Sequence, residues 1–220
     1  MQSPFRTRVK ICCISSLEEA RLATRLGADA LGLVGKMPSG PGVIGDEQAA
    51  DIVANTPPPL ATFMLTSETT VDAIIAHQLR VGANTIQLVD AVPPDTYVQL
   101  HAALPAVKLV QVIHVLDEQS IDEALQAVQL GADALLLDSG NPTLVVKELG
   151  GTGRVHNWQV SRQIVEQSPV PVFLAGGLQA GNVRQAIDTV HPFGLDICSG
   201  VRTNGHLDEQ KLASFMNLVR

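Results

Sequence analysis

The sequence has few aromatic residues and no excess of positive charge. Phenylalanine, tryptophan and tyrosine make up 3% of the 220 residues, too few for the stacking surfaces on which proteins bind single-stranded nucleic acids. The formal net charge is −7 and the isoelectric point lies near 5.3, which argues against nucleic acid or an anionic membrane as the main partner. An anionic small molecule remains compatible with this charge, because it needs only local hydrogen-bond donors.

Long apolar runs and cysteine frameworks are missing as well. No stretch reaches the roughly 18 apolar residues of a transmembrane helix, and residues 1–8 lack the apolar core of a signal peptide, so we expect a cytoplasmic protein. The three cysteines, Cys12, Cys13 and Cys198, are an odd number and suit a reducing compartment. Neither Cys-x-x-Cys nor His-x-x-x-His spacing occurs, so we expect no metal site.

A short motif that recurs along the chain predicts the fold. Residues 26–33 and 130–137 differ at one position, and residues 81–88 are a looser copy. Each copy places a glycine suited to a helix C-cap before an apolar run typical of a buried strand. The spacing predicts units of about 26 residues, near the minimum for a strand and a crossover helix, and about eight such units in the chain. With no linker in the sequence, we predict a single domain, residues 1–220, folded as a (β/α)8 or TIM barrel.

The apolar and turn patterns set the expected elements. We predict strands over residues 8–14, 30–34, 60–65, 84–88, 107–113, 133–138, 170–175 and 194–198. We predict helices over residues 16–26, 46–56, 68–80, 94–103, 117–129, 159–167, 182–190 and 207–219. The segments 35–45 and 139–156 are expected to be long loops.

The active sites of such barrels lie at the carboxyl ends of the strands. That rule selects one residue set in this sequence: Cys12 or Cys13, Gln87, Asp138, Gly176, Gly177, Asp196, Cys198 and Ser199. Asp29 and Asp133 precede strands and fall at the opposite end, so we assign them no chemistry. Glycines after strands 6, 7 and 8 favour a phosphate site, because glycine lets backbone N–H groups approach an anion. The alternative is that Gly176 and Gly177 only form a tight turn.

Two residues are candidates for proton transfer. Strand alternation puts Lys10 and Cys12 on one face and Cys13 on the other, so the ammonium of Lys10 would favour a thiolate at Cys12. Spacing alone nevertheless favours a structural role for Cys12 and Cys13 as small buried apolar residues that take no part in catalysis. Asp138 ends an apolar strand, and partial burial would raise its pKa and suit a general acid. A helix cap or a salt bridge is the alternative for Asp138.

Five segments in order carry a resemblance to a known family. They are residues 10–14, Lys-Ile-Cys-Cys-Ile; residues 135–138, Leu-Leu-Leu-Asp; residues 150–153, Gly-Gly-Thr-Gly, with Trp158 soon after; residues 173–178, Phe-Leu-Ala-Gly-Gly-Leu; and residues 195–201, Leu-Asp-Ile-Cys-Ser-Gly-Val. Together they resemble phosphoribosylanthranilate isomerase, a barrel of the ribulose-phosphate-binding type. The resemblance covers nearly the whole chain.

The resemblance implies an Amadori rearrangement of phosphoribosylanthranilate, the third step of tryptophan synthesis from chorismate. It makes Asp138 the general acid that opens the furanose and Cys12 the general base at C2. The residues implied in substrate or phosphate binding are Lys10, Gln87, Gly151, Gly153, Gly176, Gly177, Asp196, Ser199 and Gly200. The resemblance implies a small-molecule sugar phosphate as partner and no cofactor, and it leaves monomer and homodimer open.

Several positions depart from the family pattern. Gly42 stands where the family has an arginine facing the anthranilate carboxylate, and Val89 replaces a histidine. Cys13 replaces a glycine, Cys198 replaces a serine, and Arg202 stands where glutamate is common. Loss of a charge-assisted contact to a carboxylate costs about 1.5–3 kcal/mol. Lys36 or Arg202 is a candidate to supply the missing charge.

Two other functions stay open at this point. One is a paralogous sugar-phosphate isomerase whose amine substituent is not anthranilate, and the other is a phospho-ligand-binding barrel without turnover. The presence of both Cys12 and Asp138 argues against a mere binder. Because strands 1 and 8 are neighbours in a closed barrel, Cys198 is expected near Cys12 or Cys13, and an oxidised pair there would silence the base.

Overall fold

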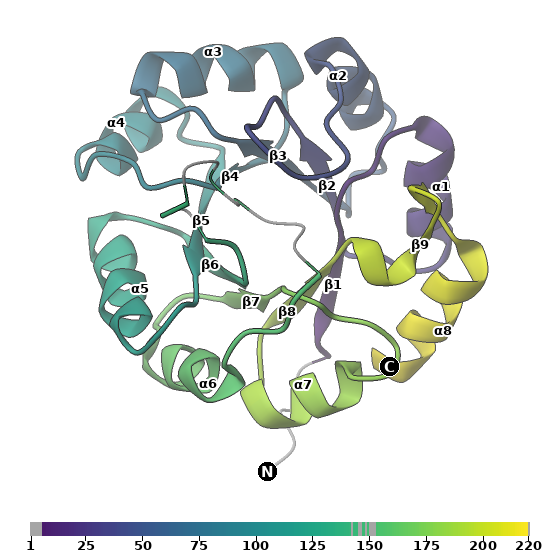
Figure 1. Cartoon of the computed structure of the whole chain (residues 1–220). Coiled ribbons are helices and arrows are strands. Elements are labelled where there is room, and N and C mark those ends of the chain that lie inside the picture. The colour runs from purple at the N-terminus through teal and green to yellow at the C-terminus, as the bar shows by residue number, and fades with distance from the viewer. Residues whose placement is uncertain (1–5, 142, 145–146, 148, 150–152, 220) are drawn as a thin grey trace.

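Eight parallel strands close into a barrel in the computed structural model, with helices around the outside (Figure 1). Residues 6–141, 143–144, 147, 149 and 153–219 are described. The strands pair in chain order and β1 closes the ring against β8, with Lys10 opposite Asp196. The (β/α)8 fold predicted from the recurring motif is therefore confirmed.

The elements follow the predicted order. The barrel strands are β1 (Arg8–Ile11), β2 (Ala30–Val34), β3 (Ala61–Thr66), β4 (Thr85–Leu88), β5 (Lys108–His114), β6 (Ala134–Asp138), β7 (Val172–Leu174) and β8 (Gly194–Ile197). The helices are α1 (Leu17–Arg25), α2 (Asp46–Ala54), α3 (Val71–Val81), α4 (Thr96–Ala103), α5 (Gln119–Leu130), α6 (Trp158–Gln167), α7 (Val183–Val190) and α8 (Glu209–Val219). A 3₁₀ turn, Ser199–Val201, and a hairpin of β9 (Arg202–Thr203) and β10 (His206–Leu207) precede α8.

The recurring motif stabilises the amino-terminal end of the barrel. The carboxylate of Asp29 accepts a hydrogen bond from the backbone N–H of Val9, and that of Asp133 accepts one from Leu109, both at 2.9 Å. In the looser copy, the side-chain oxygen of Asn84 accepts a hydrogen bond from the backbone N–H of Thr62 in β3. Each motif thus ties its strand to an earlier neighbour, which agrees with a structural role for the two aspartates.

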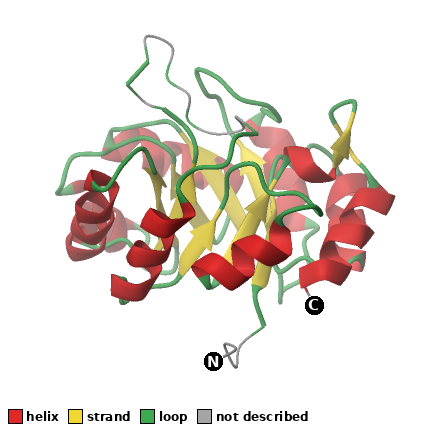
Figure 2. Cartoon of the chain, turned by 60° about the horizontal axis from the view of Figure 1, so that its bottom comes forward, coloured by secondary structure: helices red, strands yellow, loops and turns green. Residues whose placement is uncertain are grey.

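The barrel interior is a packed core rather than a channel. Phe63 and Phe173 pack edge to face inside it, with ring centroids 5.8 Å apart, beside Val110 and Leu136. Figure 2 shows the N-terminus at one end of the barrel and long loops at the other. Within the described part of the chain, no helix is long and apolar enough to cross a membrane.

Most predicted boundaries differ from the observed ones by one to three residues, and two of these differences have a clear physical reason. The first strand ends at Ile11 instead of residue 14, because Cys13 adopts the left-handed conformation with φ of 63°. The last helix begins at Glu209 instead of residue 207, because a hairpin precedes it. Asn204 and Gly205 have φ of 51° and 82°, as a two-residue hairpin turn of this sequence requires.

Candidate active site

One pocket at the carboxyl ends of the strands gathers most of the predicted site residues. Cys12, Gln87, Asp138, Gly153, Gly176, Gly177, Asp196 and Ser199 line it, together with Cys13 and Cys198. Lys10 lies fully buried below this pocket, Gly200 packs beside it, and Gly151 lies outside the described residues. The loop after β2 adds Met37, Ser39, Gly40 and Pro41, four residues that sequence reasoning did not single out.

A buried positive charge lies at the base of the pocket. The Nζ atom of Lys10 donates to Oδ1 of Asp196 at 2.9 Å and to Sγ of Cys12 at 3.5 Å. Burial is the largest single effect on the pKa of Lys10 and lowers it, but the charges of Asp196 and Cys12 and the hydrogen bond to Asp196 together outweigh burial, and the pKa is raised. A Cβ atom on Gly32 would lie 2.8 Å from the Cys12 sulfur, so only glycine leaves room for this pair. The ammonium therefore stays charged beside Cys12, the environment in which a cysteine acts as base or nucleophile.

Asp138 occupies the opposite wall, at the end of β6. Its Oδ1 atom accepts a hydrogen bond from the backbone N–H of Ser139 at 2.7 Å. Burial raises the pKa of Asp138, and the N–H of Ser139 and the nearby His114 only partly offset that effect. A carboxyl group held in this way retains its proton to higher pH than usual, as a general acid requires.

Gln87 brings an unpaired polar atom into the pocket. The residue is 3% exposed, and its Oε1 atom makes no hydrogen bond to any residue in the part of the chain that the structure describes. Buried polar atoms are rarely left without a partner in native proteins. Its position in the pocket wall makes a ligand hydroxyl or amine the natural donor for this oxygen.

The glycines of the loops after β7 and β8 are required by close packing. Gly176 and Gly177 have φ of 78° and 61°, and a Cβ atom on Gly177 would lie 2.7 Å from the carbonyl carbon of Arg154. A Cβ atom on Gly200 would lie 2.1 Å from the carbonyl oxygen of Leu178. The loops after β6, β7 and β8 therefore interlock, and their backbone forms one side of the pocket.

Sequence reasoning missed two histidines that adjoin the residues of the site. His114 is the last residue of β5, one position beyond the predicted strand, and its Nε2 atom donates to the carbonyl of Val89 at 3.0 Å. It thus places an imidazole against the residue that replaces the family's histidine. His156 lies beside Gly176, and burial lowers its pKa to about 4, so its ring is neutral near pH 7. A longer fifth strand in the prediction would have identified His114.

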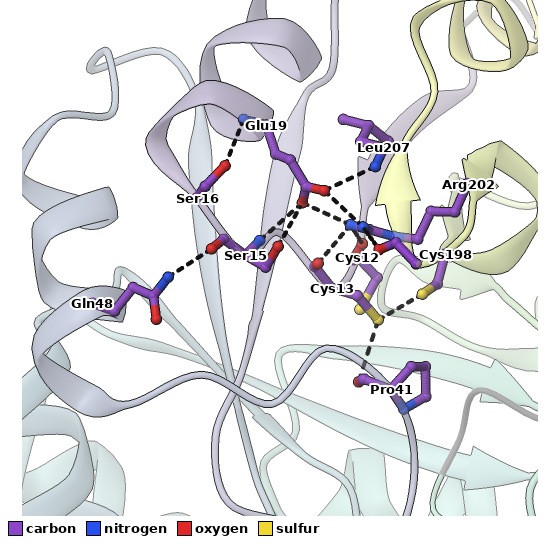
Figure 3. A network of polar contacts seen from close by, with 11 residues as sticks. Cys12, Cys13, Ser15, Ser16, Glu19, Pro41, Gln48, Cys198, Arg202 and Leu207 are labelled. Atoms are coloured by element: carbon purple, nitrogen blue, oxygen red, sulfur yellow. Dashed lines mark hydrogen bonds and ion pairs between the residues drawn. The ribbon is translucent and has the colours of Figure 1, made fainter.

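Cys13 faces the pocket, and the prediction that it points to the opposite face from Cys12 is wrong. Alternation stops where β1 ends, and the left-handed backbone of Cys13 turns its side chain toward β8. Its sulfur lies 2.6 Å from the sulfur of Cys198 (Figure 3). A Cβ atom on Gly42 would lie 2.5 Å from the Cβ atom of Cys13. Three departures from the family pattern are therefore in contact with one another.

Arg202 holds the backbone of the two adjacent cysteines (Figure 3). Its Nη1 and Nη2 atoms bind the two carboxylate oxygens of Glu19 at 2.9 and 3.0 Å, and Nη2 also donates to the carbonyls of Cys12 and Cys13. Burial raises the pKa of Glu19, but the hydrogen bonds from Arg202 and from backbone N–H groups outweigh it, and the pKa is lowered. Both terminal nitrogens of Arg202 are thus occupied, and Lys36, the other candidate for the missing charge, is exposed and is not among the residues that line the pocket.

Comparisons with known sequences agree on one family. The sequence model of N-(5'phosphoribosyl)anthranilate (PRA) isomerase matches residues 9–218. N-(5'-phosphoribosyl)anthranilate isomerase 2 of Methanosarcina mazei is 34% identical and covers 97% of this chain and 94% of its own. The N-(5'-phosphoribosyl)anthranilate isomerase of Methanocella arvoryzae is also 34% identical, over 97% of this chain and 98% of its own.

Solved structures give the same result. The phosphoribosyl anthranilate isomerase of Thermotoga maritima superposes with a TM-score of 0.81 at 28% identity, over 97% of this chain and 98% of that chain. A phosphoribosyl anthranilate isomerase in complex with reduced 1-(o-carboxyphenylamino)-1-deoxyribulose 5-phosphate superposes with a TM-score of 0.80 at 26% identity, with the same coverage.

Proposed function

Because the chain belongs to the N-(5'-phosphoribosyl)anthranilate isomerase family, we propose that it converts N-(5-phosphoribosyl)anthranilate into 1-(o-carboxyphenylamino)-1-deoxyribulose 5-phosphate by an Amadori rearrangement. This reaction is the third step of tryptophan synthesis from chorismate. A small-molecule sugar phosphate is then the ligand of the pocket, and a cytoplasmic location stays a prediction.

One observation carries the proposal. Cys12, at the end of β1, and Asp138, at the end of β6, line the same pocket, and each has the surroundings that its role needs. A charged ammonium lies beside Cys12, and burial raises the pKa of Asp138. A pair of groups whose environments differ in this way is the usual arrangement for acid and base catalysis in one site.

Asp138 acts first in the proposed mechanism. Its carboxyl group gives a proton to the furanose ring oxygen, the C1–O bond breaks, and the lone pair of the anilino nitrogen forms a C1–N double bond. The ring opens to an iminium ion, and Asp138 is left as a carboxylate. The raised pKa of Asp138 favours this transfer, because the carboxyl group keeps its proton to a higher pH than an ordinary aspartate does.

Cys12 acts second. Its thiolate takes the proton from C2, the C–H electron pair forms a C1–C2 double bond, and the iminium electrons return to nitrogen. The resulting enol loses its hydroxyl proton and gains a proton at C1, which gives the ketose. The ammonium of Lys10, 3.5 Å from the sulfur, offsets the negative charge on Cys12 before the transfer.

The remaining pocket residues suit the two ends of a sugar phosphate. Backbone groups of Gly153, Gly176, Gly177 and Ser199 line the side formed by the interlocked loops, and glycine allows a phosphate to approach the chain there. Gln87 supplies a buried acceptor for a ribose hydroxyl or the substrate amine. Asp196 fixes Lys10, so its role in the mechanism is to position the ammonium.

The test is turnover of phosphoribosylanthranilate generated in situ, followed by the loss of its fluorescence. Fluorescence decay that depends on enzyme concentration, with the carboxyphenylamino deoxyribulose phosphate as product, supports the proposal. No decay, with inorganic phosphate still bound at the pocket, rules out this substrate and supports a phospho-ligand-binding barrel or a paralogue.

A second candidate is an isomerase of the same chemistry whose amine is not anthranilate. The observation that favours it is the close contact of Gly42 with Cys13, which leaves no room for an arginine side chain where the family holds the anthranilate carboxylate. Turnover of phosphoribosyl amines that lack the carboxylate distinguishes the two candidates. The second candidate requires that such a substrate turns over faster than phosphoribosylanthranilate.

A further inference from the structure

Two cysteines that the proposed reaction does not use meet at the rim of the pocket. The sulfurs of Cys13 and Cys198 lie 2.6 Å apart and share a hydrogen bond, although the residues are far apart in sequence (Figure 3). Cys13 follows β1 directly after Cys12, and Cys198 follows β8 directly before Ser199. Both also line a second hollow of about 260 Å³ next to Arg202 and Gly205, which gives a second route to the sulfurs.

We propose that Cys13 and Cys198 form an oxidation site, in which a reversible disulfide between them switches off the adjacent active site. The pair that forms is Cys13–Cys198, and Cys12 keeps its free thiol. The inference goes beyond the isomerase reaction, because it concerns a covalent state of the protein and not a step of turnover.

The sulfur chemistry gives each cysteine a separate role. The hydrogen bond with Cys13 lowers the pKa of Cys198 and outweighs the effect of burial, and the nearby guanidinium of Arg202 adds to the lowering. Hydrogen bonds with Cys12 and Cys198, together with burial, raise the pKa of Cys13. Cys198 is therefore the sulfur that ionises, and a thiolate is the attacking form in disulfide exchange.

A low-molecular-weight disulfide such as glutathione disulfide is the oxidant. The thiolate of Cys198 attacks one of its sulfurs, the S–S bond breaks, and one glutathione thiolate leaves. Cys13 then loses its proton, attacks the Cys198 sulfur of the mixed disulfide and releases the second glutathione. Two electrons pass from the protein to the oxidant, and two glutathione thiols form.

The disulfide would disturb both halves of the active site. A disulfide has an S–S distance of about 2.05 Å, so the two sulfurs must approach further and draw the ends of β1 and β8 together. Cys12 and Ser199 are the direct chain neighbours of the linked residues. The sulfurs close from 2.6 Å to about 2.05 Å, roughly half of the 1 Å displacement that lowers turnover by about 100-fold, so we expect a loss of about tenfold.

The experiment is oxidation of the full-length protein with glutathione disulfide, followed by thiol titration, peptide mapping and the turnover assay. We expect the count of free thiols to fall from three to one and a peptide pair linking Cys13 to Cys198. We expect kcat/KM to fall by about tenfold and to recover with dithiothreitol. The Cys198→Ser variant should keep its activity through the same treatment, while Cys12→Ser should still form the cross-link.

Three results would overturn the proposal. One is a full set of three thiols after treatment with excess oxidant. Another is a cross-link that includes Cys12. The third is the same reversible loss of activity in Cys198→Ser as in the unmodified protein, which would place the oxidation on Cys12 itself. Absence of isomerase activity in the reduced protein would instead contradict the proposed function. The thiol count and the peptide map would then still test the disulfide by themselves.

Discussion

The two sides of the barrel mouth differ in how closely they follow the family pattern. On the side of β6 and β7, Asp138 and the glycine loops keep the family residues, and steric contacts such as that of Gly177 with Arg154 leave no alternative to glycine. The departures gather around β8, β1, β2 and β4, where Cys198, Cys13, Gly42 and Val89 differ from the pattern. The acid and the sugar-phosphate side are thus retained, while the side expected to face the amine has been rebuilt.

The residues that depart from the family pattern around Cys13 are linked to one another by direct contacts. Gly42 touches Cys13, Cys13 touches Cys198, and Arg202 holds the backbone of Cys13. Restoring one family residue alone would create a clash, because the space for an arginine side chain at position 42 is taken by Cys13. Departures that look independent in the sequence are therefore one structural change.

The largest expected effects come from the catalytic pair. Replacing Cys12 with serine or Asp138 with asparagine should lower kcat by about 10²–10⁴-fold, the usual contribution of a general acid or base. Steady-state kinetics checks this, with circular dichroism to show that each variant is folded. Residual kcat within a few-fold of the unmodified enzyme would remove these residues from the mechanism.

The ion pair that holds the rebuilt side comes next. Glu19→Gln should reduce the free energy of unfolding by about 3–5 kcal/mol, because it leaves the buried Arg202 without its counter-charge. The exposed neighbour Glu18→Gln is the matched control and should cost little.

The ion pair of Glu19 and Arg202 also makes the stability of the folded protein depend on pH in the acid range. The pKa of Glu19 is lowered in the folded protein, so its stabilising contribution is complete above the unfolded value of about 4.3 and is lost as the pH falls through the folded value. Urea unfolding at a series of pH values measures it. An equal acid response in Glu19→Gln would show that other carboxylates dominate.

A smaller effect tests the contact between Gly42 and Cys13. Gly42→Ala should destabilise the protein by about 1–3 kcal/mol through overpacking, and part of this cost should disappear in the Cys13→Gly background. Gly45→Ala, in the same loop with open space around it, is the control. Strictly additive free energies in the double variant would contradict the structural coupling.

The smallest change is in the pH profile. Asp138 must be protonated to act, so kcat/KM should decline as the pH rises through its raised pKa. In Asp138→Asn the residual activity should lack this alkaline decline. A rate profile with the same decline in the variant would assign it to another group.

The sequence was sufficient to predict the barrel because the spacing of the recurring motif gives the length of one strand-and-helix unit. It was sufficient to place Asp138 in the pocket because the carboxyl ends of all strands meet at one end of this fold. It was not sufficient for Cys13. Alternation assumes that the strand continues, and a cysteine does not itself indicate the left-handed turn that ends β1. The signal that could have shown this turn is the glycine that the family has at position 13. His114 was missed because strand ends are set by tertiary pairing with β6, which extends β5 by one residue.

Substrate preference tests the comparison of the two sides most directly. The measurement is the ratio of kcat/KM for phosphoribosylanthranilate to that for phosphoribosylaniline, which lacks the carboxylate and forms from ribose 5-phosphate and aniline. Without an arginine contact of about 1.5–3 kcal/mol, we expect a ratio below about tenfold in this enzyme. We expect a larger ratio in the Cys13→Gly/Gly42→Arg variant. A ratio above about 100-fold in the unmodified enzyme would show that another cation holds the carboxylate and would contradict the account.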